Sequence, residues 1–487
     1  MERLIGNIVS GLARVDPGRT AATLDKREMT FGEVDLAANR LATALRRRKI
    51  VRGDLVAWWS NPSLETVVVM IACARLGAVF APLSPLLGDP EVGQALDYIE
   101  PAVLIADPNL VGRAGDGVTI EEVVHGAGTD PVDESGLRDS DPHILYLTSG
   151  STGRPKGVLV SHRASWMRSW RGVGGYGKAI DGFLVPFPLF HYAGWHFVLE
   201  GWLNGSGAHL VGRASGAEIA SAIERHRPTA TYCIPAVWER LLAEPVDLGH
   251  FRIADTGTST VSADLVARMR EAMPKARTTI SYGASEAGQI CILEDAEIEA
   301  HPGSVGRPLA QGRMRIAEDG EILFSGPTLM DGYLNMPEET ARAVDDGWYH
   351  TGDLGSQDDE GFVHITGRIR EVIRSGGETI SPSEIEGALG SLPGVSELAI
   401  IGVPDPTWGE VVCAVVVPAR GSDAPTVADL RDRLGNLAPY KHPRSVVIAE
   451  EIPRTAATGQ VRRAALREEL LAARPCREGA SAGTRMT

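Results

Sequence analysis

The chain has 487 residues, of which 43% are hydrophobic and 23% are charged, a composition typical of a globular protein with two or more domains. Its formal net charge of −15 excludes nucleic acid as the main partner, because no excess of cations is available to neutralise a phosphate backbone. Its five cysteines include no CxxC pair, so we expect reduced thiols in a cytoplasm and no cysteine metal site.

Helical periodicity and short apolar strands alternate in the first part of the chain. The helices are expected at residues 31–45 and 64–76, and the strands at 55–58, 103–106 and 145–147. This alternation predicts an α/β fold with mostly parallel, helix-covered sheets. The longest apolar run, residues 66–83, contains Arg75, a charge that is costly in lipid. We therefore expect a buried helix passing into a strand, with no membrane span, no secretory signal and a cytoplasmic location.

A Ser/Gly-rich loop follows the strand expected at residues 145–147. Its residues are Thr148, Ser149, Gly150, Ser151, Thr152, Gly153, Arg154, Pro155 and Lys156. Small residues let backbone N–H groups approach an anion, hydroxyls add donors, and the lysine adds a positive charge. The loop therefore predicts a polyphosphate cradle. It is not a P-loop, because Lys156 lies six residues after Gly150 and directly follows a proline.

The motif GVGGYG at residues 172–177 matches the GxGxxG pattern of dinucleotide-binding proteins only in its letters. The segment before it does not have the character of a strand, and a strand is expected at 183–185, where the pattern needs a helix. An ordinary glycine-rich loop is therefore predicted.

After about residue 300 the alternation of helices and strands gives way to short strands with Gly/Pro turns, which predict a small barrel-like region. Helices are expected at residues 382–389 and 427–437, and strands at 397–403 and 411–417. This second half therefore ends in a compact α+β unit. Residues 474–487 are small, polar and patternless, so we expect a disordered tail.

The ordered motifs resemble those of the adenylate-forming superfamily, which includes acyl- and aryl-CoA synthetases, peptide-synthetase adenylation domains and firefly luciferase. They are YLTSGSTGRPKG (146–157), FPLFHYAGW (187–195), DTGTSTV (255–261), SYGASEAG (281–288), WYHTGDLG (348–355), GRIREVIRSGGETISPSEIE (367–386) and VPDPTWGEVV (403–412). The resemblance implies a large N-terminal domain over residues 1–367 and a hinge at 368–370 that includes Arg370. It also implies a small C-terminal domain over 371–473 that rotates between two half-reactions.

The resemblance assigns ATP to a set of residues that the chain keeps. Lys156 and the loop hydroxyls would hold the β- and γ-phosphates, Glu286 would ligate Mg²⁺ as a hard oxygen donor, and Tyr282 would offer a flat surface to the adenine. Asp353 would accept the ribose hydroxyls, with Arg368 nearby. The full cofactor-binding set is Thr148, Ser149, Gly150, Ser151, Thr152, Gly153, Thr258, Ser281, Tyr282, Gly283, Ser285, Asp353, Arg368 and Gly376, of which Gly376 would line the pantetheine channel of CoA.

The acid pocket expected from the resemblance mixes aromatic and polar side chains, which suits a medium-sized or aromatic acid. Its members are His191, Tyr192, Trp195, Tyr232, Ile234, Val237, Thr258, Gly283 and Gln289. His191 is read either as a gate and catalytic residue or as a packed core histidine. Thr258 stands where the family usually has Gly or Ala, and we expect it to shorten the pocket.

The C-terminal signature departs from the family pattern, because Gln460 stands where a lysine usually bridges the substrate carboxylate and the α-phosphate. Losing such an electrostatic partner typically costs about 10²–10³ in rate. Three explanations remain open. Arg462 or Arg463 reaches the site in its place, the substrate does not need the lysine, or the first half-reaction is lost.

We expect an ATP- and Mg²⁺-dependent ligase that adenylates a small-molecule acid, releases pyrophosphate and passes the acyl group to CoA. One alternative keeps adenylation but couples the product to an amine, or activates nitrite toward an aryl amine. Another is a degenerate relative that binds nucleotide without turnover; the retained Lys156, Glu286, Asp353 and Arg368 argue against it. The sequence carries no signature of oligomeric state, and a homodimer is left open.

Overall fold

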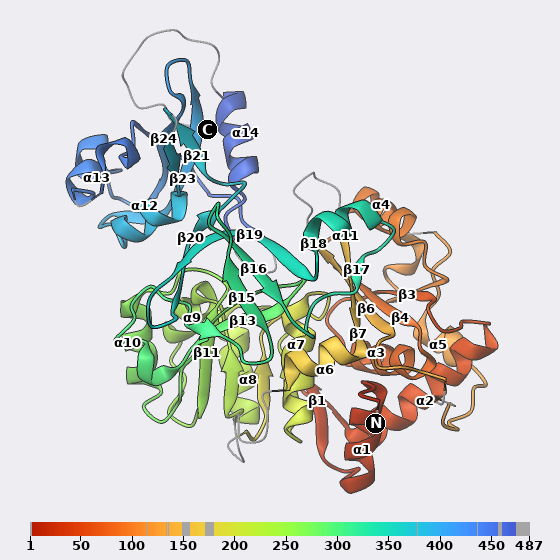
Figure 1. The fold of residues 1–487 in the computed structure, drawn as a ribbon. Coiled ribbons are helices and arrows are strands. Elements are labelled where there is room, and N and C mark those ends of the chain that lie inside the picture. The colour runs from red at the N-terminus through yellow and green to blue at the C-terminus, as the bar shows by residue number, and fades with distance from the viewer. Residues whose placement is uncertain are drawn as a thin grey trace.

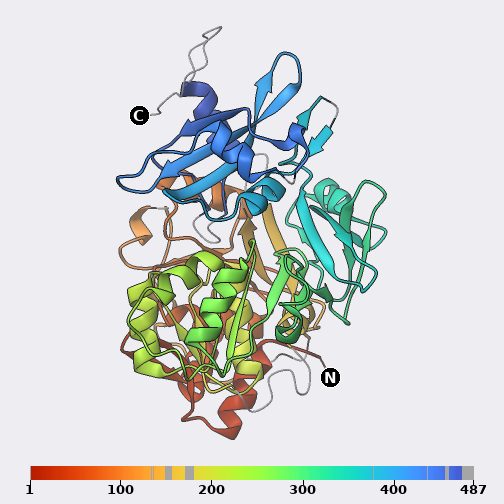
Figure 2. The same cartoon turned by 90° about the vertical axis from the view of Figure 1, so that its left-hand side faces the viewer.

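The computed structural model describes residues 2–113, 115–132, 134, 136–148, 156–170, 180–376, 378–435, 437–455 and 460–473. The α/β prediction is confirmed: two large helix-covered sheets make up most of the N-terminal part, and a smaller α+β unit follows. Figure 1 shows that unit, in blue, above the rest of the chain, and the turned view of Figure 2 shows it lying across the top. The glycine-rich motif at 172–177 and the tail at 474–487 lie outside the described residues.

The first sheet has the strand order β14-β13-β12-β11-β10-β8-β9-β1-β2. Its strands are β1 (Thr20–Leu24), β2 (Arg27–Thr30), β8 (Phe183–Val185), β9 (Ala208–Leu210), β10 (Ala230–Tyr232), β11 (Ile253–Gly257), β12 (Ile280–Ala284), β13 (Gly288–Leu293) and β14 (Arg307–Pro308). Pairing is parallel from β12 through β1 and antiparallel at both outer ends. The carboxyl ends of β10, β11 and β12 therefore meet at one edge of this sheet.

The second sheet has the order β17-β7-β6-β4-β3-β5. Its strands are β3 (Leu55–Trp59), β4 (Val79–Leu83), β5 (Val103–Ala106), β6 (Pro142–Thr148), β7 (Lys156–Ser161) and β17 (Gly332–Tyr333). Along β3, Val56 and Trp58 join one hydrophobic cluster, whereas Ala57 and Trp59 join another. Both faces are thus buried, which explains why this strand is a continuous apolar run.

The helices of the N-terminal part cover the two sheets. They are α1 (Gly6–Val15), α2 (Phe31–Arg47), α3 (Glu65–Leu76), α4 (Asp89–Ile99), α5 (Ile120–Val124), α6 (His162–Ser169), α7 (Tyr192–Leu203), α8 (Gly216–His226), α9 (Pro235–Leu242), α10 (Ala263–Ala272) and α11 (Pro337–Ala343). The expected buried helix is α3, which leads into β4. Its Arg75 is buried, and the cost of burying the charge is offset by hydrogen bonds that it donates to Asp35 and Asn39 at 2.5 and 2.7 Å. No helix within the described ranges has the length and apolar character that crossing a bilayer requires.

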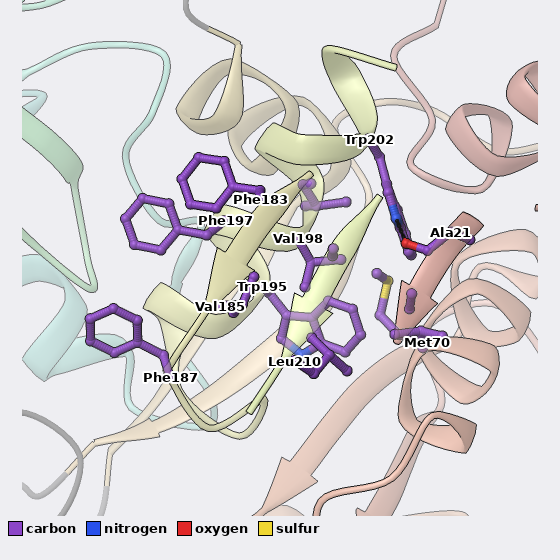
Figure 3. Packing of buried hydrophobic residues seen from close by; sticks show 14 of the residues in the cluster. Ala21, Met70, Phe183, Val185, Phe187, Trp195, Phe197, Val198, Trp202 and Leu210 are labelled. Atoms are coloured by element: carbon purple, nitrogen blue, oxygen red, sulfur yellow. Dashed lines mark hydrogen bonds between the residues drawn. The ribbon is translucent and has the colours of Figure 1, made fainter. Parts of the chain in front are cut away.

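Helix α7 joins the two sheets through its aromatic residues (Figure 3). Trp195 meets Phe80 of β4 edge to face, with ring centroids 5.8 Å apart. Phe197 stacks on Phe183 of β8 at 5.2 Å. Trp195 is 0% exposed, so each of these contacts belongs to the hydrophobic core. The helix that follows the FPLFH segment is therefore anchored on both sheets.

The barrel-like region expected after residue 300 is a five-stranded antiparallel sheet of β15 (Arg313–Ile316), β16 (Glu321–Ser325), β18 (Val344–Asp345), β19 (Trp348–Gln357) and β20 (Val363–Arg368). The C-terminal unit has a sheet of β21 (Ile373–Ser375), β22 (Glu378–Ile380), β23 (Val395–Asp405), β24 (Gly409–Pro418) and β25 (Ser445–Ile448). Its helices are α12 (Pro382–Leu389), α13 (Val427–Arg433) and α14 (Arg463–Ala473). The helix expected to reach residue 437 ends at Arg433, because Leu434 closes it and Gly435, a poor helix former, follows.

Candidate functional site

The two strands that flank the expected phosphate loop are paired so that the loop begins and ends at one place. Thr148 ends β6 and Lys156 begins β7, and the two residues are partners in the antiparallel register. The Thr148 hydroxyl donates to the Lys156 carbonyl at 3.3 Å. The loop residues between them, Ser149, Gly150, Ser151, Thr152 and Gly153 included, lie outside the described residues.

Lys156 and Glu286 come close together through a third residue, Tyr333. The Lys156 Nζ lies 4.7 Å from the centre of the Tyr333 ring. The Tyr333 hydroxyl donates to Glu286 Oε1 at 2.9 Å. Burial, and then the adjacent carboxylate, raises the pKa of Tyr333, so its hydroxyl stays protonated and remains a donor. The fold thus joins a cation, a phenol and a carboxylate from β7, β17 and the turn after β12.

The residues expected to bind ribose form a connected group. Asp353 of β19 and Arg368 of β20 are register partners, and Arg368 Nε lies 2.9 Å from Asp353 Oδ1. The Tyr282 hydroxyl donates to Asp353 Oδ2 at 2.7 Å. Burial raises the pKa of Asp353 and the Arg368 charge opposes that rise. Each carboxylate oxygen keeps a further lone pair for an incoming hydroxyl.

The SYGASEAG segment is a tight turn between β12 and β13. Ser281 and Tyr282 lie in β12, next to Gly283 and ahead of Ser285. A Cβ on Gly283 would stand 2.2 Å from the Gly288 carbonyl oxygen, so only glycine fits there. The close approach of the two strands therefore sets the direction in which Ser285 and Glu286 leave the sheet.

Gln460 reaches from the C-terminal unit to the N-terminal one. Its Nε2 donates to the Thr258 carbonyl at 3.2 Å. Thr258 has φ +70°, a backbone conformation that β-branched residues rarely adopt, and its hydroxyl is 2.8 Å from the Tyr232 hydroxyl. Ser281 O accepts the Thr258 amide at 3.4 Å. The residue in the usual lysine position is therefore brought to the edge where β11 and β12 end.

The other expected acid-pocket residues come from three places in the fold. Tyr232 is buried at the end of β10 and stacks on Phe197, whereas Ile234 and Val237 are buried at the start of α9. Gly283 and Gln289 are register partners in β12 and β13. Tyr192 opens α7, with its ring 5.9 Å from Tyr146.

His191 and Trp195, two of the residues expected at the acid pocket, are both held by contacts within the protein. His191 is the N-cap of α7, where its Nδ1 accepts the Ala193 amide at 3.2 Å, and burial lowers its pKa to about 4. It is therefore a neutral capping histidine in this arrangement. Trp195 contacts Phe80 of β4 and is enclosed by the core in this arrangement, and its place in the pocket wall stays a prediction.

The hinge segment is tied to the last helix. Arg463, the first residue of α14, forms ion pairs of 2.6 Å with Glu371 and with Glu386. Its Nε also donates to the Ile400 carbonyl at 3.2 Å. Arg370, the expected hinge residue, is exposed one position before Glu371. Arg463 is thus engaged within the C-terminal unit, away from the role of substitute for the missing lysine.

Two residues at the site were missed by sequence reasoning. Tyr333 stands in the DGYLN segment, whose only signal was a tyrosine after a glycine. Arg168 lies in α6, and its guanidinium donates to the carbonyls of Ser285 and Glu286 at 3.0 Å each. Neither belongs to a motif, and each reaches the site only because sheets and helices distant in sequence pack together.

Both parts of the chain match known proteins. Residues 11–334 match the family model of the AMP-binding enzyme, and residues 384–458 match that of the AMP-binding enzyme C-terminal domain. An indoleacetate–CoA ligase of Aromatoleum aromaticum is 34% identical over 94% of this chain and 96% of its own length. A feruloyl-CoA synthase of Amycolatopsis sp is 35% identical over 93% and 97%.

A solved structure shows the same architecture. The O-succinylbenzoate coenzyme A synthetase of Bacillus subtilis, in complex with ATP and magnesium ion, superposes with a TM-score of 0.83 at 26% identity, over 94% of this chain and 98% of that one. Both parts of the chain are thus matched by sequence and by fold. The chain belongs to the AMP-binding enzyme family and is an acyl-CoA synthetase-like member of the adenylate-forming superfamily.

Proposed function

We propose that this enzyme adenylates a carboxylic acid with ATP, releases pyrophosphate and transfers the acyl group to CoA. The observation that carries the proposal is the convergence of three groups at one edge of the sheets. Lys156, Tyr333 and Glu286 form the first, Tyr282, Asp353 and Arg368 the second, and Thr258 with Gln460 the third. A phosphate chain, a ribose and an acyl phosphate require a cation, a paired carboxylate and polar groups in this arrangement.

The donor set fits a magnesium nucleotide. Glu286 Oε1 accepts from Tyr333, and the carboxylate has further lone pairs that a cation could use. Among the described residues no group of three His, Cys, Asp or Glu side chains could hold a metal by itself. Mg²⁺ commonly binds through one or two carboxylates plus phosphate oxygens, so Glu286 beside Lys156 suits it. When bound, the ion would neutralise phosphate charge, while Lys156 and the loop orient the phosphates.

The acid is proposed to be aromatic or medium-sized. Tyr232, Phe197 and Phe187 form an aromatic cluster behind Thr258, with Tyr232–Phe197 and Tyr232–Phe187 centroid distances of 4.9 and 5.8 Å. The relatives named for indoleacetate and ferulate support an aromatic substrate class. Thr258 places a hydroxyl over this cluster and so limits the depth available to a ring.

CoA is proposed as the acceptor, and the C-terminal unit carries a surface suited to its nucleotide. Trp408 is 43% exposed and the Arg444 guanidinium lies 4.8 Å from its ring centre. Arg444 also lines a hollow together with Arg431, Pro439 and His442. The Gly376 amide donates to the Trp408 carbonyl at 2.8 Å, which joins this surface to the segment expected to line the pantetheine channel. Adenine stacks on exposed aromatic rings, and arginine binds phosphates.

The two half-reactions would alternate by rotation of residues 371–473 about residues 368–370. In the present arrangement Gln460 contacts Thr258, a position that adenylation would require of this residue. The segment that contains Gly376 would have to turn to the same edge for thioester formation. None of the described cysteines forms a disulfide, which suits an enzyme that works in the reducing cytoplasm.

The deciding measurement is pyrophosphate release from the full chain with Mg-ATP and a panel of aromatic and aliphatic acids. Each acid is tested with CoA, with an amine, and with nitrite plus an aryl amine. We expect release to be fastest with an aromatic acid and to need CoA for multiple turnovers. Multiple turnovers that ignore CoA but follow the amine or nitrite would instead support one of those acceptors, and nucleotide binding without release would indicate a degenerate relative.

The acceptor surface is tested by Arg444→Ala, with Arg420→Ala as the matched control at an exposed position of the same unit. We expect Arg444→Ala to raise KM for CoA about tenfold, because a charge-assisted hydrogen bond to phosphate is lost. Single-turnover formation of the adenylate should not change. An unchanged KM for CoA would reject this surface while leaving the acid and ATP assignments intact.

A further inference from the structure

Arg168 is a buried cation behind the turn that contains Ser285 and Glu286. It lies in α6 and is 3% exposed. Its Nε donates to the Thr328 carbonyl at 2.8 Å, and its two terminal nitrogens donate to the Ser285 and Glu286 carbonyls at 3.0 Å each. One guanidinium therefore joins α6, the turn after β12 and the segment before β17.

This position is costly for a charge and is not explained by packing alone. Within the described part of the chain Arg168 makes no ion pair with a carboxylate, and burial lowers its pKa. The charge is compensated by three main-chain oxygens and by the Tyr192 ring, whose centre lies 5.1 Å from the guanidinium carbon. The carboxylates of Glu286 and Asp331, which form no ion pair with it, also favour its charged form. A methionine or leucine would fill the same space without that cost. The contribution of the arginine is therefore its hydrogen bonds to the main chain.

Glu286 is held by three contacts, of which Arg168 supplies one. Its carbonyl accepts from Arg168 and from the Met330 amide at 2.7 Å, and its carboxylate accepts from Tyr333. Two residues on, Gly288 has φ +72°, and a Cβ there would lie 2.8 Å from Arg168 Cγ. The turn thus lies directly on the Arg168 side chain, and its backbone cannot shift without breaking these bonds.

We propose that Arg168 is a positioning residue that fixes the Ser285–Glu286 turn for the nucleotide phosphates and, through Tyr192, links that turn to the acid pocket. The proposal rests on the proposed adenylation function for its catalytic consequence, but not for its effect on the turn. Arg168 acts through the turn and touches none of the reacting atoms.

The test compares Arg168→Lys and Arg168→Gln with Arg163→Lys, a matched control at an exposed position of the same helix. Amide hydrogen exchange of residues 284–288 is measured in the ligand-free full chain. Exchange in Arg168→Lys should be about tenfold faster than in the wild type. The lysine has all its donors on one nitrogen, whereas the planar guanidinium reaches three separate carbonyls from three nitrogens. The control should exchange at the wild-type rate.

Pyrophosphate release supplies the second readout. We expect kcat to fall roughly 10–100-fold in Arg168→Lys while KM for ATP changes less than about threefold, because a turn misplaced by about 1 Å loses the reacting geometry more than binding. Gly288→Ala, which presses on the Arg168 side chain, should have the same effect and provides a second variant if Arg168→Gln does not fold.

Wild-type exchange and wild-type kcat in Arg168→Lys would overturn the proposal. If the wild-type protein releases no pyrophosphate with any acid, the proposed function fails, and the exchange measurement still decides the role of Arg168.

Discussion

Gln460 brings a neutral amide to the place where the adenylate-forming pattern has an ammonium. Its Nε2 bonds to the Thr258 carbonyl, so the side chain reaches the edge where β11 and β12 end although it carries no charge. An ammonium about 4 Å from an anion interacts by roughly 4 kcal/mol at an effective dielectric constant of about 20. Thr258 itself, at φ +70°, is held by the Tyr232 hydroxyl at 2.8 Å, so the carbonyl that receives Gln460 is fixed in direction.

The missing charge predicts a gain of function. Gln460→Lys should raise the rate of pyrophosphate release by about 10²–10³, since the new ammonium would meet the charge that develops between carboxylate and α-phosphate. Gln357→Lys, which adds the same charge at an exposed position, serves as the control. A slower or unchanged Gln460→Lys enzyme would mean that its natural acid reacts without this partner.

At the scale of elements, the start of α14 is anchored to the residues that follow the hinge. Arg463 pairs with Glu371 after the hinge and with Glu386 in α12, both at 2.6 Å. The isolated bridge between Arg454 and Val461 closes the segment that presents Gln460. The position of Gln460 therefore depends on a helix and a hinge that the ion pairs connect.

The sequence leaves open whether Arg462 or Arg463 substitutes for the missing lysine. The ion pairs of Arg463 allow the two arginines to be tested separately. Arg463→Gln leaves two carboxylates without their cation, and we expect a loss of about 1–3 kcal/mol in the stability of the C-terminal unit. Adenylation should slow about tenfold, because Gln460 is no longer held in place. Arg462→Ala, at the exposed neighbour, should stay within about twofold of the wild type. Stopped-flow adenylation and thermal unfolding measure both effects, and a reversed order would make Arg462 the substitute for the lysine.

At the scale of the whole molecule, buried neutral histidines tie separate parts of the large unit together. His162 Nδ1 accepts the Ile5 amide at 3.2 Å, and its ring stacks on His143 at 4.8 Å. His209 Nδ1 lies 2.9 Å from the Thr23 hydroxyl, which joins β9 to β1. Burial lowers the pKa of His162 and of His209 to about 4. These rings must stay uncharged for the native packing to persist.

Stability should therefore fall as the pH falls from about 6.5 toward 4. Over this range the unfolded chain binds a proton at each of these histidines and the folded chain does not, which costs up to about 1.4 kcal/mol per pH unit for each. Asp331, whose pKa burial raises to about 6, opposes the trend with one proton. Urea unfolding at pH 7 and pH 5 measures the difference, and His162→Gln should reduce it. A midpoint that is the same at both pH values would contradict this account.

Local patterns were sufficient for much of the architecture. The strand expected at 103–106 and the helix expected at 382–389 have the observed bounds. The strand is a short apolar run, and the helix begins after the Ser381 N-cap with a proline in its first turn and ends before Gly390. The helix expected at 427–437 was too long because a glycine near its end outweighed the apolar periodicity. The burial of Trp195 was not predicted, because a motif names a helix but does not say which face of that helix meets the neighbouring sheet.

The sequence by itself determined the family, the α/β class, the two-part organisation and the departure at Gln460, since each rests on residue type and order along the chain. Only the tertiary structure decided that Tyr333 bridges Lys156 and Glu286, that Arg168 supports the turn, and that Arg463 is engaged elsewhere. These residues carry no motif of their own. Their roles come from contacts between residues at least 47 positions apart, which arise when burial of the apolar faces brings the segments together.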